Sequence, residues 1–148
     1  MVEKKISNKE IMERIKQANE HTVMSKLGLE IASFDPDELV VTAKVGEHLF
    51  QPAGIVHGGV YVLMAESAAS IAATLSIDLS KEIAFGMEIN ANHLRPVSEG
   101  SLKAIATPLH RGKTTHLYDI KIYDEKQRLI SVSRCTIAIR PHRSEKIF

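Results

Sequence analysis

Residues 58–77 read GGVYVLMAESAASIAATLSI, and this stretch decides the fold. Its twenty residues hold one formally charged side chain, Glu66, so the stretch is long and apolar enough to raise the question of a membrane span. The carboxylate near its middle and its many alanine, serine and glycine residues make insertion into a bilayer unfavourable. We therefore expect a buried helix in a protein without a membrane partner, with small alanine side chains that let a sheet approach closely.

The segments on either side of this helix have the pattern of strands and turns. Residues 28–46 contain two runs rich in β-branched side chains around Asp35-Pro36-Asp37, which predicts a β-hairpin. Four further runs follow the helix, separated by turn signals at Gly100, Arg111-Gly112 and 124–127. They predict strands within 82–96, 101–112, 114–128 and 129–141.

The ends of the chain are more polar. Within residues 1–20, apolar side chains recur at helical spacing after Ser7 or Asn8, which predicts a short amphipathic helix with one of these two residues as its N-cap. A helical turn is expected at 22–27, and residues 141–148 are expected to form a loose tail. The order of elements predicts an α+β fold for a single domain, 1–148, in which five or six antiparallel strands wrap around one long central helix.

Composition excludes several classes of protein. With 148 residues, 44% hydrophobic and 25% charged, the chain has the make-up of one globular domain and not of a disordered or fibrous protein. The formal net charge of +1 gives no broad positive electrostatic field that would attract a nucleic acid, so no nucleic-acid partner is expected.

Cys135 is the one cysteine, which excludes an intrachain disulfide, and no signal peptide is visible in residues 1–7. We expect a cytoplasmic protein.

Glu66 is the feature that points to chemistry. It is the only formally charged residue between positions 48 and 77, and a lone carboxylate in an apolar helix is costly to bury. Such a group either pairs with a distant cation or faces a cleft, and the sequence alone leaves both open. Gly58 and Gly59 follow His57 at the start of the helix, where free backbone N–H groups can bind a ligand oxygen.

The spacing of these groups predicts a dimer. Gly58 and Glu66 are eight residues apart, which corresponds to about 12 Å along one helix at about 1.5 Å per residue. One reacting carbonyl cannot contact both groups of the same helix. If both act on one bond, they must come from two chains related by a two-fold axis.

The segment QPAGIVHGGVYVLMAES, followed by GMEINANHLRP and the later strands, resembles the hotdog-fold acyl-CoA thioesterases. It is similar to their phenylacetate-degradation (PaaI) type, and most of all to the 1,4-dihydroxy-2-naphthoyl-CoA hydrolases of menaquinone biosynthesis. Enterobactin-pathway proofreading thioesterases share the pattern. The resemblance covers about residues 27–139 and implies a hydrolase of acyl-CoA thioesters that forms a homodimer, paired into a homotetramer in many members. Coenzyme A is then part of the substrate, and no cofactor is expected.

The resemblance also implies roles for individual residues. Glu66 matches the catalytic carboxylate, as a nucleophile or as a general base for water. The Gly58 amide would polarise the thioester carbonyl across the dimer interface. Further positions match residues around the acyl group: Gln51 and His57 orient the thioester, Ser70 holds the attacking water, and Ser67, Met64 and Gly59 lie near the substrate.

The expected coenzyme A contacts lie in three places. Positive charge for the phosphates would come from Arg95, Arg111 and Lys113. The complete set implied by the resemblance is Gly86, His93, Leu94, Arg95, Pro96, His110, Arg111, Gly112, Lys113, Thr114 and Thr115.

Other readings of the sequence have less support. The seven histidines lack acidic partners at ligand spacing, so no metal site is expected, and Cys135, Met24, Met64 and Met87 are expected in the core. Met64 and Met87 are also candidates to border an acyl pocket.

One alternative function is that of a non-catalytic module that binds acyl-CoA, against which the retained Glu66 argues. Another is a hotdog dehydratase or hydratase, although no Asp lies between Asp37 and Asp78. Naphthoyl, benzoyl, phenylacetyl and medium-chain acyl groups all remain open.

Overall fold

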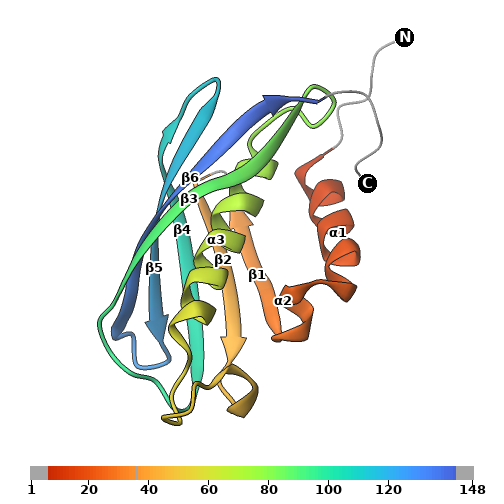
Figure 1. Cartoon of the computed structure of the whole chain (residues 1–148). Helices are drawn as coiled ribbons and strands as arrows, with labels where there is room; N and C mark the ends of the chain where they lie inside the picture. The colour runs from red at the N-terminus through yellow and green to blue at the C-terminus, as the bar shows by residue number, and fades with distance from the viewer. Residues whose placement is uncertain (1–6, 36, 143–148) are drawn as a thin grey trace.

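The structure is a computed structural model that describes residues 7–35 and 37–142. Six strands form one antiparallel sheet that curls around the long helix α3 (Gly58–Leu75), with strand order β1-β2-β4-β5-β6-β3 (Figure 1). This confirms the predicted α+β architecture. The strands are β1 (Leu29–Asp35), β2 (Glu38–Lys44), β3 (Glu82–His93), β4 (Ser101–Arg111), β5 (Thr115–Asp124) and β6 (Leu129–Pro141). The other helices are α1 (Asn8–Ala18) and α2 (Val23–Lys26), with short 3₁₀ turns η1 (Asn19–His21) and η2 (Glu47–Leu49).

Helix α3 fills the hollow of the curled sheet. By length and composition it could cross a membrane, but 44% of that stretch is buried inside the protein. Four alanines, at positions spaced along the face toward the sheet, have no exposed surface: Ala65, Ala68, Ala69 and Ala73. Because an alanine side chain ends at Cβ, the strands can pack close to the helix axis. This confirms the expectation of a buried helix lined by small residues.

The N-terminal helix is fixed by a capping box and by two apolar side chains. The Ser7 hydroxyl accepts a hydrogen bond from the Glu10 N–H, and the Glu10 carboxylate accepts one from the Ser7 N–H in return. Ile11 and Met12 are buried, and α1 contacts α3. Ser7 is therefore the N-cap. Residue 36 of the predicted hairpin turn and residues 143–148 of the predicted tail lie outside the described part of the chain.

Strand β3 forms one edge of the sheet and carries a β-bulge. It pairs with β6 along its length, and the register shifts between Gly86 and Glu88. At this bulge Met87 is 60% exposed, and Phe85 is also exposed. The expectation that Met87 lies in the core is therefore wrong: the extra residue of the bulge turns its side chain out at an unpaired edge. Met24 and Met64 are buried, as expected.

Candidate active site

The start of α3 leaves one backbone N–H free. His57 is the N-cap, and its Nδ1 accepts a hydrogen bond from the Gly59 N–H at 2.9 Å, while its carbonyl accepts one from Val60. The first helical residue, Gly58, has no acceptor within the helix, and its N–H donates to no atom of the described residues. The positive end of the helix dipole lies here as well. A carbonyl oxygen can therefore bind at the Gly58 N–H.

The side chains of His57 and Gln51 present hydrogen-bond donors at the same end of the helix. Because Nδ1 of His57 accepts from an N–H, the proton of the neutral ring lies on Nε2. Gln51 lies in the tight loop before α3, where its Oε1 accepts from the Ala53 N–H at 3.1 Å. A backbone N–H can only donate, so the amide nitrogen of Gln51 is left as a donor. These two residues and Gly58, which we call the donor cluster, suit an oxygen that gains negative charge.

Glu66 lies two turns further along α3 and is half-buried. Within residues 7–35 and 37–142 its carboxylate makes no hydrogen bond or ion pair. Of the two interpretations left open by the sequence, the structure thus excludes a paired structural charge among the described residues. The carboxylate lies against β3 at Gly86, where a Cβ would overlap with its Oε1. We call Glu66 and Gly86 the carboxylate site.

The donor cluster and the carboxylate site lie at different points along β3. His93 is beside Gly58, and in the sheet it pairs with Ser131. Gly86 is beside Glu66 and pairs with Ile137. Seven residues of strand separate them, or about 23 Å at about 3.3 Å per residue. One chain therefore does not bring the two groups to one bond, which agrees with the helix spacing.

The remaining residues expected near the acyl group lie along α3. Ser67 and Ser70 are half-buried close to Glu66, and the Ser70 carbonyl accepts a hydrogen bond from the Thr74 hydroxyl at 2.8 Å. Met64 has no exposed surface, and the Gly59 N–H is already bound by His57. Their roles in substrate binding stay predictions.

The expected coenzyme A residues are also divided between the two ends. The hairpin 110–115 joins β4 to β5 at the Gly86 end, because Thr115 pairs with Ala138, which in turn pairs with Phe85. Residues 93–96 lie at the Gly58 end. Three of the expected coenzyme A residues are basic and exposed: Arg95, Arg111 and Lys113. The Arg111 guanidinium pairs with the Asp37 carboxylate at 3.1 Å, and that of Arg95 donates a hydrogen bond to the Leu129 carbonyl at 2.8 Å. Such exposed contacts are weak, so a phosphate could replace them.

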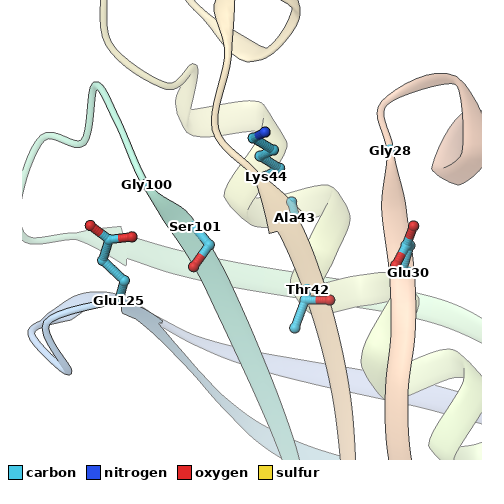
Figure 2. A pocket seen from close by; sticks show the side chains of 8 residues that line it. All are labelled: Gly28, Glu30, Thr42, Ala43, Lys44, Gly100, Ser101 and Glu125. Carbon is cyan, nitrogen blue, oxygen red and sulfur yellow. The ribbon is translucent and has the colours of Figure 1, made fainter.

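A hollow of about 500 Å³ lies elsewhere, at the ends of β1, β2 and β4 (Figure 2). It carries mixed charge from Glu30, Lys44 and Glu125, and none of its lining residues is an expected site residue. We therefore do not assign the substrate to it. The complete lining is Gly28, Glu30, Thr42, Ala43, Lys44, Gly100, Ser101 and Glu125.

Two other chemistries gain no support. In the part of the chain that the structure describes, no group of three or more His, Cys, Asp or Glu side chains could hold a metal ion. Cys135 is buried in the core, as expected, and burial raises the pKa of its thiol to about 12, with a contribution from the nearby charge of Glu66. A thiol with so high a pKa is a poor nucleophile.

Sequence reasoning missed three contacts of this site. The proximity of Gly86 to Glu66, of His93 to Gly58, and of Ser131 to His93 all depend on strand register. One signal was available for the first of them. A glycine inside a strand often marks a close approach by another group, and Gly86 interrupts an otherwise regular strand pattern.

Comparison with known proteins gives a consistent result. The sequence profile of the thioesterase superfamily matches residues 53–131. A 1,4-dihydroxy-2-naphthoyl-CoA hydrolase of Listeria monocytogenes is 48% identical over 79% of this chain and 94% of its own. Among solved structures, a mutant of thioesterase PA1618 from Pseudomonas aeruginosa is 33% identical with a TM-score of 0.85, covering 88% of this chain and 94% of its own. Thioesterase HI1161 from Haemophilus influenzae is 36% identical with a TM-score of 0.84, over 90% and 94%.

Proposed function

Because the chain belongs to the thioesterase superfamily and is a thioester hydrolase of the hotdog fold, we propose that it cleaves an aromatic acyl-CoA to the free acid and coenzyme A. The observation that carries the mechanism is the half-buried carboxylate of Glu66, which has no hydrogen-bond or ion-pair partner in the described residues. The preference for an aromatic acyl group is supported by the name of the Listeria relative.

In the proposed reaction, Glu66 acts on the thioester carbon while the donor cluster binds the carbonyl oxygen. As a nucleophile, a carboxylate oxygen bonds to the carbonyl carbon, the C–S bond breaks, and coenzyme A leaves as a thiolate. Water then hydrolyses the resulting anhydride. As a general base, Glu66 instead takes a proton from the water that attacks the same carbon. In both routes the Gly58 N–H, with the donors of His57 and Gln51, stabilises the oxyanion.

The proposed active site joins two chains. Strand β3 has a free edge with the exposed Phe85, so two copies can pair through it antiparallel. A two-fold axis near Ile89 and Asn90 lies midway between Gly86 and His93. It would bring the carboxylate site of one chain to the donor cluster of its partner, and the two groups of coenzyme A residues would meet at the same place. A tetramer, a cytoplasmic location and the lack of a cofactor remain predictions from the sequence.

The test is release of free thiol from 1,4-dihydroxy-2-naphthoyl-CoA, benzoyl-CoA and hexanoyl-CoA. We expect Glu66→Gln, which keeps the size of the side chain and removes its charge, to lower kcat by about 100-fold or more on the aryl thioesters. Glu38→Gln is the matched control, because this exposed carboxylate lies on β2, away from β3 in the sheet, and is not part of the site or of the proposed interface between the two chains.

Two outcomes would contradict the proposal. A folded, dimeric Glu66→Gln protein with full activity would remove Glu66 from the mechanism. A wild-type protein that cleaves hexanoyl-CoA far better than both aryl thioesters would remove the aromatic preference, while leaving the role of Glu66 to be judged from the variant.

A further inference from the structure

His93 occupies the space beside the first residue of α3. A Cβ built on Gly58 would lie 2.8 Å from Nε2 of the His93 ring and 2.9 Å from its Cδ2. The ring also packs against the buried Tyr61, with 5.2 Å between ring centroids. His93 thus lies beside Gly58, the residue that carries the free N–H, on the same chain as the donor cluster.

The tautomer of this ring is set by a buried serine. Ser131 has no exposed surface, and its hydroxyl donates to the Asn92 carbonyl at 3.2 Å. A hydroxyl has one proton, so the Ser131 oxygen can only accept from Nδ1 of His93, 3.0 Å away. Nδ1 therefore carries the proton, and Nε2 of the neutral ring is left as a hydrogen-bond acceptor.

The two histidines at the start of α3 are therefore opposite in character. His57 is capped through Nδ1 and presents a donor at Nε2, whereas His93 is anchored through Nδ1–H and presents an acceptor at Nε2. A bound carbonyl oxygen needs donors, and the donor cluster supplies them. The acceptor of His93 suits a second group on the substrate, one that carries a proton close to that carbonyl oxygen.

We propose that His93 binds a hydroxyl on the ring carbon next to the one that bears the thioester, and that Ser131 is a positioning residue which keeps His93 an acceptor. This inference rests on the proposed function. In a 2-hydroxyaryl thioester the hydroxyl lies beside the carbonyl oxygen, as Nε2 of His93 lies beside the Gly58 N–H. The named substrate of the Listeria relative also has a hydroxyl on the carbon next to its acyl group. A hydroxyl at the far end of the ring lies too distant from the carbonyl to reach His93.

This role differs from the one implied by the family resemblance, which assigns His93 to coenzyme A. The two roles are separable by kinetics. A contact with coenzyme A affects all CoA thioesters alike, whereas a contact with the ring hydroxyl affects only those that carry it in the adjacent position.

The experiment compares kcat/KM for 2-hydroxybenzoyl-CoA and 4-hydroxybenzoyl-CoA, which have the same atoms and differ in the position of one hydroxyl. The variants are Ser131→Ala and His93→Phe, with Ser133→Ala as the control. Ser133 is a buried serine on the same strand whose hydroxyl has no hydrogen-bond partner among the described residues. Because an adjacent hydroxyl also changes the intrinsic reactivity of the thioester, the readout is the ratio of the two kcat/KM values in each variant relative to wild type.

We expect the ratio to fall about three- to tenfold in Ser131→Ala and in His93→Phe, the range for loss of one neutral hydrogen bond, and to stay unchanged in Ser133→Ala. Equal losses on both isomers in Ser131→Ala and His93→Phe would overturn the inference and return His93 to coenzyme A. Absence of hydrolysis of either thioester by the wild-type protein would instead count against the proposed function itself.

Discussion

Gly86 has no side chain where the backbone of β3 passes the carboxylate of Glu66. Its φ is not among the positive values in the structure, so the backbone there does not require glycine. What requires glycine is space, since a Cβ would overlap with Oε1 of Glu66. The end of a glutamate side chain can rotate away, so a larger residue at this position would displace the carboxylate and leave the fold intact.

At the residue scale, we therefore predict that Gly86→Ala folds normally and loses activity. A displacement of the reacting group by about 1 Å can reduce the rate by about 100-fold, so kcat should fall by about 10- to 100-fold with little change in KM. Thermal unfolding and thiol-release kinetics check the two parts. Ala32→Ser, a change of similar size at an exposed position of β1 on the opposite edge of the sheet, should leave both quantities near the wild-type values. A Gly86→Ala enzyme with normal kcat would contradict the argument.

Residues close in sequence were the ones that sequence reasoning could place. The run from Gln51 to Glu66 identified both groups that carry chemistry, one at the start of α3 and one near its middle, because helix geometry converts the spacing directly into distance. The contact of His93 with Ser131 joins two strands, and no local pattern predicts it. Met87 was misplaced for a related reason: alternation along a strand does not reveal a bulge.

At the scale of elements, the packing of α3 against the sheet depends on small side chains. We predict that Ala68→Leu destabilises the protein by about 1–3 kcal/mol, because a fully buried alanine leaves no room for three more carbon atoms. Ala72→Leu is the matched control on the half-buried side of the same helix and should have a smaller effect. Urea unfolding measures both, and equal stability of the two variants would show that the helix face is assigned wrongly.

The elements themselves were largely predictable, but their arrangement was not. Strand pairs joined by short turns, such as β1 with β2 and β4 with β5, follow from local turn signals. The pairing of β2 with β4 and of β3 with β6 joins segments far apart in the chain, and many registers share the same hydrophobic pattern. The edge position of β3, on which the two-chain site depends, therefore required the structure.

At the scale of the whole molecule, a site shared between chains predicts complementation. Gln51→Ala damages the donor cluster, and Glu66→Gln damages the carboxylate site. In a one-to-one mixture of exchanged subunits, half of the dimers are mixed, and each mixed dimer regains one of its two sites. We expect thiol release to recover to about a quarter of the wild-type rate.

The control mixture combines Glu66→Gln with Gly86→Ala. Both changes fall in the carboxylate site, so no mixed dimer regains an intact active site and the rate should not rise above that of the separate variants. If the first mixture shows no recovery once subunit exchange has been verified by mass, each active site lies within one chain. Recovery in the control mixture would instead show that Glu66 and Gly86 of one chain serve different active sites.

The cap of α3 by its own His57 side chain has a consequence for binding energetics. The hydrogen bond from the Gly59 N–H both starts the helix and turns Nε2 of the ring outward as a donor. The oxyanion donors are thus preorganised as soon as the helix forms, before any substrate arrives. Little conformational entropy then remains to be lost at this end of the site on binding, so more of the interaction energy is available to stabilise the transition state.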